Sequence, residues 1–193
     1  EANENTLQFV QTTANERFTA LQTGQIDILI RNTTWSTQRD AELGVSFGPV
    51  IYYDGQGVMV HTSLGVSTME ELDNVSICTL TGTTTELNIT EAMEELGLTY
   101  ELVPLEEASQ TIAAFEEGRC DVLTSDQSQL AGLRSNAADP GSMVVLPAII
   151  SKEPLTPAYM EGDPAFGDVV DWAIYATFTA EEFGITQGNI DEF

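Results

Sequence analysis

Apolar runs and amphipathic stretches alternate along most of the chain. Short aliphatic runs predict strands at residues 7–10, 26–30, 56–61, 75–80, 99–103, 120–124 and 144–150. Stretches with apolar residues three or four positions apart predict helices at 15–23, 67–72, 84–96, 108–117, 128–134 and 168–179. Strands that alternate with helices are typical of α/β proteins with a mostly parallel sheet.

A weak internal repeat suggests two lobes of similar build. Residues 20–29 and 114–123 each contain a helix end, a glycine, two residues, an aspartate and a strand. Glycine is favoured just past a helix because it accepts the left-handed conformation. We expect residues 62–146 to form lobe two and 1–61 plus 147–193 to form lobe one, with the ligand site in the cleft between them.

The net charge of −25 is extreme, with 31 acidic and 6 basic residues. Such a surface repels nucleic acid and anionic membranes, so we expect neither as a partner. The acids are scattered rather than clustered, which favours solubility or adaptation to salt over an acidic docking surface for a basic partner. No apolar run approaches the roughly 20 residues of a membrane helix.

The cysteines and the histidine offer little chemistry by themselves. Cys78 and Cys120 are too few for a zinc site, and they fit either one disulfide or two buried thiols. His61 has no triad partners nearby and is expected at the surface. We expect no metal and no cofactor. The chain begins at Glu1 without a leader pattern, so we expect a processed chain or a fragment.

Polar residues follow the predicted strand at 26–30. Asn32, Thr34 and Arg39 lie where ligands bind in open α/β sheets, beyond the carboxyl ends of strands. The planar fork of Arg39 matches a carboxylate. Alternatively, residues 32–37 form a capping loop and Arg39 makes a surface ion pair with an adjacent acid.

Two further elements follow strands of the expected lobe two. Thr83 and Thr84 begin a predicted helix after Gly82, and helix N-termini attract anions. Thr83 and Glu86 also have capping-box spacing, which simple helix capping explains equally well. Asp126 follows the strand at 120–124 and suits an ammonium group, or else it is the N-cap of the next helix.

Together these elements predict a receptor for a zwitterion. The chain also resembles the general L-amino-acid-binding proteins of polar amino-acid ABC transporters, which are type II periplasmic solute-binding proteins. The resemblance spans nearly all of the chain, and its motifs lie at residues 17–24, 31–35, 52–57, 82–88, 118–122 and 150–155.

The resemblance implies a role for each candidate residue. Arg39 and Thr84 would hold the ligand carboxylate, with Thr83 beside them. Asp126 would hold the amino group. Asn32 and Thr34 would add hydrogen bonds. It also favours a disulfide between the two cysteines, and it implies that lobe one lacks its first strand and helix in this chain.

The expected function is therefore capture of free L-amino acids in the periplasm, after removal of a signal peptide, and delivery to ABC permease subunits. We expect a monomeric binding protein rather than an enzyme. The alternatives are a sensory amino-acid-binding domain and a dehydratase-type enzyme on the same fold, which would need an acid or base poised in the cleft.

Overall fold

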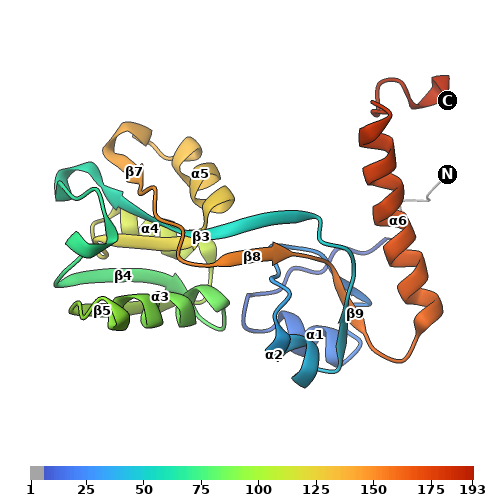
Figure 1. Ribbon diagram of the computed structural model, residues 1–193, viewed down its shortest axis with the longest axis horizontal. Helices are drawn as coiled ribbons and strands as arrows, with labels where there is room; N and C mark the ends of the chain where they lie inside the picture. The colour runs from blue at the N-terminus through green and yellow to red at the C-terminus, as the bar shows by residue number, and fades with distance from the viewer. Residues whose placement is uncertain (1–6) are drawn as a thin grey trace. The chain divides into compact units, whose positions relative to one another are not determined.

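The computed structural model of the protein describes residues 7–193, so the first six residues of the expected lobe one lie outside it. The chain forms two compact units (Figure 1). Unit 1 contains Asp54–Glu153 together with the N-terminal residues up to Ala20, and unit 2 contains Leu21–Tyr53 and Pro154–Phe193. Both units are discontinuous in sequence, whereas only lobe one was expected to be, and their boundaries fall at other residues. The lobe assignment therefore stays a prediction.

Unit 1 is an α/β sandwich around a six-stranded sheet with the order β5-β4-β6-β3-β7, to which β8 is added beside β3. The strands are β3 (Tyr52–His61), β4 (Val75–Leu80), β5 (Tyr100–Leu105), β6 (Val122–Asp126), β7 (Met143–Val145) and β8 (Lys152–Leu155). The helices are α3 (Thr84–Glu95), α4 (Ala108–Glu116) and α5 (Gln127–Asn136). Strands β5, β4 and β6 are parallel, whereas β3 is antiparallel to β6 and β7.

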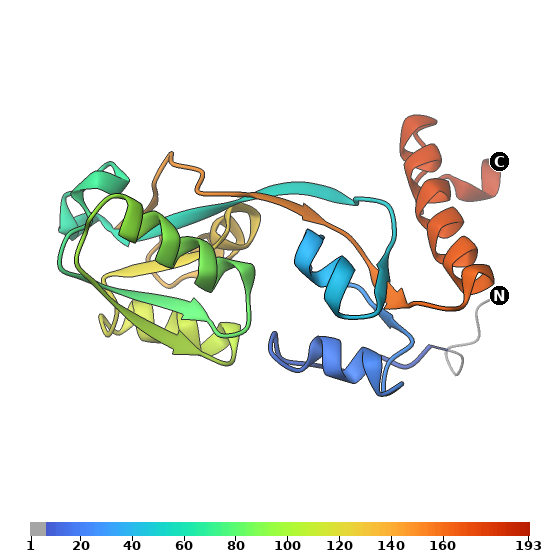
Figure 2. The ribbon, with the colours of Figure 1, turned by 60° about the horizontal axis from the view of Figure 1, so that its bottom comes forward.

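Two apolar clusters cover the two faces of this sheet, because successive strand residues point to opposite faces. Ile77 and Val122 pack with Ile89 of α3 on one face. The next residue of each strand, Cys78 and Leu123, packs with residues of α4 and α5 on the other face. Figure 2 shows α3 lying along its side of the sheet. The parallel part of the prediction, from β4 to α5, is confirmed.

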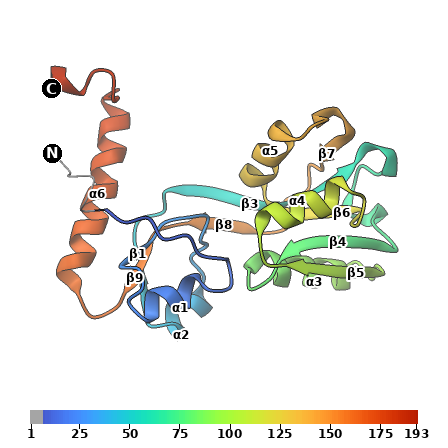
Figure 3. The same cartoon turned by 180° about the vertical axis from the view of Figure 1, so that it is seen from behind.

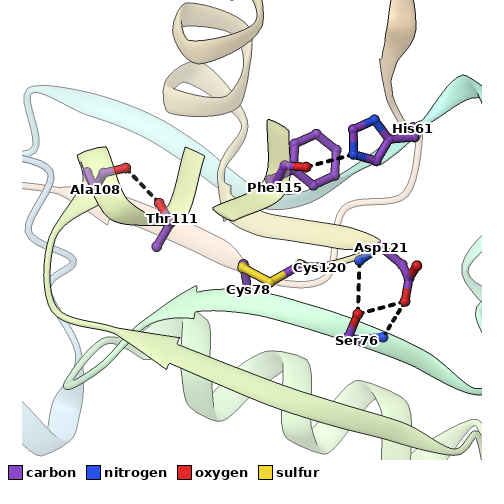
Figure 4. The surroundings of a disulfide bond; sticks show 8 residues. All are labelled: His61, Ser76, Cys78, Ala108, Thr111, Phe115, Cys120 and Asp121. Atoms are coloured by element: carbon purple, nitrogen blue, oxygen red, sulfur yellow. Dashed lines mark hydrogen bonds between the residues drawn. A yellow bond between two sulfur atoms is a disulfide. The ribbon is translucent and has the colours of Figure 1, made fainter. Parts of the chain in front are cut away.

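A disulfide joins Cys78 of β4 to Cys120, just before β6 (Figure 4). Both cysteines are fully buried in the second cluster, which contains Phe115 of α4. The alternative of two buried thiols is therefore wrong. His61 is half-buried rather than at the surface, with its ring stacked on Phe115 at 4.1 Å and its Nε2 atom 2.8 Å from the Phe115 carbonyl oxygen.

Unit 2 contains a three-stranded sheet in the order β1-β9-β2. Its strands are β1 (Ile28–Leu29), β2 (Val45–Phe47) and β9 (Ala158–Met160), and its helices are α2 (Thr37–Glu42) and α6 (Pro164–Glu182). Helix α1 (Arg17–Gln22) contains the boundary between the units. Figure 3 labels β1 and β9. Strand β9 returns from far along the chain and pairs antiparallel with both neighbours, so this sheet is not parallel as the alternation had suggested.

Helix α6 packs on β9 through a close approach that requires glycine. A Cβ atom at Gly167 would lie 2.9 Å from the hydroxyl oxygen of Tyr159. The ring of Tyr159 also meets Phe166 edge-on at 6.1 Å. Burial raises the pKa of Tyr159, and the nearby carboxylates of Asp171 and Asp168 raise it further.

Two predicted strands are corrected. Residues 7–10 form no strand, because Leu7 and Phe9 are 66% and 90% exposed and find no ladder in the described part of the chain. The strand predicted at 144–150 ends at Val145. Pro147 has no N–H group to continue the ladder, and the backbone N–H of Ile150 instead donates to the carbonyl oxygen of Gln56.

Candidate functional site

In unit 2, the loop after β1 is fixed by backbone contacts with the segment at 154–156. Thr34 forms an isolated antiparallel bridge with Leu155. The Trp35 N–H donates to the carbonyl oxygen of Pro154 at 2.9 Å, and the Thr156 N–H donates to that of Thr33 at 3.0 Å. Thr34 is buried and Asn32 is half-buried. These backbone hydrogen bonds therefore fix the position of the loop within unit 2.

Arg39 is buried, with 8% of its surface exposed, in the short helix α2. Its Nη1 atom donates to the Thr34 carbonyl oxygen at 2.8 Å, and its backbone N–H donates to the N-cap hydroxyl of Ser36 at 3.3 Å. Its neighbours Asp40 and Glu42 are exposed, whereas Arg39 itself is buried. A buried guanidinium needs polar partners, and the carbonyl of Thr34 is one of them.

In unit 1, Thr83 is the N-cap of α3. Its hydroxyl oxygen accepts the Glu86 N–H at 3.2 Å. The Glu86 carboxylate accepts the Gly82 N–H at 3.0 Å, one residue earlier than a strict capping box would have it. Gly82 has φ +69, and a Cβ atom there would lie 3.2 Å from Cα of Asn15, so this glycine accommodates the N-terminal segment.

Thr84, the first residue of α3, donates its hydroxyl to Glu153. The Thr84 Oγ1 atom lies 3.1 Å from Glu153 Oε2. The Asn88 amide donates to Glu153 Oε1 at 3.0 Å, and the Ser151 hydroxyl donates to the same oxygen. Glu153 is only 2% exposed. This buried carboxylate was not anticipated from the sequence, because two of its three partners, Thr84 and Asn88, come from a helix 65 or more residues earlier in the chain.

Asp126 ends β6 at the N-cap position of α5, and it is 7% exposed. Its side chain makes no capping hydrogen bond. Instead, the carboxylate of Asp54 in β3 accepts the backbone N–H of Ser128 at 3.4 Å and also its hydroxyl. Since Asp54 contacts the first turn of α5, the N-cap alternative for Asp126 loses its support.

Gln56 connects the two candidate elements of unit 1. Its side-chain amide donates to the carbonyl oxygen of Thr85 in α3 and to the hydroxyl of Thr124 in β6, each at 2.9 Å. It is opposite Asp126 in the β3–β6 ladder and is fully buried. The carboxyl ends of β4 and β6, with Thr83, Thr84 and Asp126, therefore lie at one edge of this sheet.

Asp121 has a structural role rather than a site role. Its Oδ2 atom accepts the Ser76 backbone N–H at 2.8 Å and the Ser76 hydroxyl at 2.7 Å (Figure 4). The backbone hydrogen bond, followed by the hydroxyl, lowers the pKa of Asp121 below its ordinary value. The aspartate of the repeat thus ties β4 to the start of β6, next to the disulfide.

Within residues 7–193, no group of three or more His, Cys, Asp or Glu side chains could hold a metal ion. In the same range, no helix has the length and apolar content needed to cross a membrane. The site candidates fall into two sets. Asn32, Thr34 and Arg39 belong to unit 2, and Thr83, Thr84 and Asp126 belong to unit 1.

The chain is related to periplasmic amino-acid-binding proteins of ABC transporters. It is 50% identical over 186 residues to the general L-amino acid-binding periplasmic protein AapJ of Rhizobium johnstonii, covering 96% of this chain and 54% of that protein. It is 46% identical to the glutamate/glutamine/aspartate/asparagine-binding protein BztA of Rhodobacter capsulatus, covering 96% of this chain and 55% of that protein. The chain thus spans about half the length of these relatives. No protein-family model matches it.

A solved structure shows the same fold. The ABC transporter periplasmic binding protein of Brucella ovis, with glutathione bound, superposes with a TM-score of 0.90 at 45% identity, covering 96% of this chain and 58% of that protein. The predicted resemblance and the α/β fold of type II solute-binding proteins are therefore confirmed.

Proposed function

We propose that this protein captures free L-amino acids outside the cytoplasm, in the periplasm, and delivers them to the permease subunits of an ABC transporter. The observation that carries the proposal is a pair of buried, oppositely charged groups, one in the helix after β1 of unit 2 and the other at the end of β6 of unit 1. Arg39 in unit 2 is 8% exposed and Asp126 in unit 1 is 7% exposed. A free amino acid carries the two complementary charges.

In this proposal, Arg39 binds the α-carboxylate, which the N–H groups at the start of α3 also attract. The N–H groups in the first turn of a helix have no partner within the helix, and Thr83 accepts only that of Glu86. Asp126 binds the α-ammonium group. Asn32 and Thr34 add hydrogen bonds to the ligand. Thr84 also holds the carboxylate, and Thr83, which caps the helix start, lies beside it.

The protein acts by binding, as the names of its relatives indicate for them, and as a monomer. A dehydratase would need an acid or base poised to protonate a leaving group. The candidate residues offer a guanidinium, an amide, hydroxyls and a carboxylate. This set suits a zwitterion better than a proton transfer, so we propose no catalytic residue.

A thermal-shift screen of the full-length protein against the twenty L-amino acids tests the proposal. D-isomers and decarboxylated analogues serve as controls. A ligand at 100 times its Kd stabilises the protein by about 2.7 kcal/mol, which gives a clear shift. Stabilisation by several L-amino acids, lost when the carboxylate or the amine is removed, supports the proposal. The absence of a shift with all twenty would refute it.

A further inference from the structure

Asp54 of β3 does for helix α5 what an N-cap residue ordinarily does for its own helix. An N-cap side chain accepts the backbone N–H of the second or third residue of the helix. The second residue of α5 is Ser128, and its N–H donates to the two Asp54 carboxylate oxygens, each at 3.4 Å. The Ser128 hydroxyl donates to Asp54 as well. The Gly55 N–H donates to Asp54 Oδ1 at 2.8 Å and so orients the carboxylate.

The N-cap position itself is occupied by Asp126, the residue proposed to bind the ligand's ammonium group. Asp126 has the non-helical backbone of an N-cap, with φ −55 and ψ 139, but its side chain makes no capping hydrogen bond. Aspartate is among the strongest N-caps, so its carboxylate would ordinarily accept N–H groups of its own helix. A carboxylate used in that way would have to give up a hydrogen bond before it could bind an ammonium group.

The β3–β6 ladder brings Asp54 to this corner of unit 1. Gln56 pairs with Asp126, and the same antiparallel register continued by two residues brings Asp54 opposite the second residue of α5. Gly57 lies so close to the helix start that a Cβ atom there would be 2.8 Å from Cγ of Gln127. The first turn of α5 is therefore held by neighbouring residues of β3 and not by the Asp126 side chain.

We propose that Asp54 is a positioning residue for ligand binding, which caps α5 in place of Asp126 so that the Asp126 carboxylate binds the ligand's ammonium group instead of its own helix. This inference rests on the proposed function. The role of Asp54 depends on an acceptor oxygen and not on a charge. Asparagine should therefore replace it, because asparagine and aspartate cap helices about equally well.

Calorimetric titration of the full-length protein with L-glutamine tests this role. In Asp54→Ala the uncapped helix competes with the ligand for Asp126. We expect the affinity to fall about fivefold, which is the free energy of a typical N-cap hydrogen bond converted into a binding constant. Asp54→Asn should keep the wild-type affinity. The matched control is Asp163→Ala, because Asp163 caps α6 in unit 2 by accepting the Phe166 N–H at 3.0 Å, and it should leave the affinity unchanged.

A second measurement needs no ligand. Urea unfolding of the ligand-free protein gives the effect of Asp126→Ala on the midpoint in the wild-type and Asp54→Ala backgrounds. This effect should be larger in the Asp54→Ala background, because Asp126 has then become the cap of α5. A purely structural role of Asp54 would give equal effects in both backgrounds. If Asp54→Ala does not fold, Asp54→Leu is used in both measurements, since leucine has a similar shape and no acceptor oxygen.

The outcomes distinguish the two proposals. If the wild-type protein binds none of the twenty L-amino acids, the proposed function fails, whatever the urea midpoints are. If it binds L-glutamine but Asp54→Ala keeps the wild-type affinity, or Asp54→Asn loses as much affinity as Asp54→Ala, only the role of Asp54 is overturned. The same holds if Asp163→Ala weakens binding equally, or if Asp126→Ala shifts the urea midpoint equally in both backgrounds.

Discussion

Replacing Asp121 tests whether the aspartate of the repeat is structural. The Asp121 carboxylate accepts two hydrogen bonds from Ser76, at 2.8 Å and 2.7 Å, and its own N–H donates to the Ser76 hydroxyl at 3.1 Å. Asp121→Ala removes the first two and leaves two Ser76 donors in a half-buried place. Hydrogen bonds to charged groups contribute roughly 1.5–3 kcal/mol each, and solvent access reduces this, so we expect a loss of about 2–3 kcal/mol.

Urea unfolding, followed by circular dichroism, measures this loss directly. For a chain of this length, about 2–3 kcal/mol corresponds to a fall in Tm of roughly 4–12 °C. Ser76→Ala and the double variant complete a cycle in which the two effects should not add, because the residues share the same contacts. A destabilisation below about 0.5 kcal/mol for Asp121→Ala would refute the structural role.

The pH dependence gives a second check on Asp121. Its pKa is lowered in the folded state, so its carboxylate stabilises the fold above the unfolded value of about 3.9. This contribution is lost as the pH falls through the lower folded value. The stability difference between wild type and Asp121→Asn should therefore be full at neutral pH and shrink below about pH 4. A constant difference down to pH 2 would contradict the assignment.

Four other variants have specific expected outcomes. Arg39→Ala and Asp126→Ala should each weaken L-glutamine binding more than about 30-fold in calorimetry, because losing one partner of a buried charge pair costs about 2–5 kcal/mol. Near-wild-type affinity in either variant would contradict the role assigned to that residue. Replacing both Cys78 and Cys120 with alanine should lower the free energy of unfolding by up to about 4 kcal/mol, as expected for a loop with a sequence separation of 42, and an unchanged urea midpoint would contradict this. Gln56→Leu should destabilise the protein by about 1–3 kcal/mol in urea unfolding, because it removes two buried hydrogen bonds, to the Thr85 carbonyl oxygen and to the Thr124 hydroxyl. A neutral result would show that these contacts contribute nothing.

The central part of unit 1 was predictable from local sequence. The strand at Val75–Leu80 and the helix that begins at Thr84 have the predicted first residues. Their signals are local, since an aliphatic run, a threonine cap and a following glycine each act within a few residues. The disulfide followed from the family resemblance.

The missed elements depend on distant partners. Strand β9 exists because Tyr159 and its neighbours lie between two strands from more than 100 residues earlier, and its three-residue pattern carries no signal of its own. The same holds for the site. Asp54, Gln56 and Glu153 gain their roles only from contacts with residues far away in the sequence. From the sequence alone, Asp54 was interpreted as a turn residue, Gln56 as the start of a strand, and Glu153 as part of a family motif.

Equilibrium dialysis of the purified full-length protein against a labelled L-amino acid tests the central claim most directly. The account predicts a single saturable class of sites for labelled L-glutamine. Other unlabelled L-amino acids should displace it, and D-glutamine should not. Loss of this saturable binding in both Arg39→Ala and Asp126→Ala would also support the proposed roles of the two residues. No saturable binding of L-glutamine or of any other L-amino acid would contradict the account.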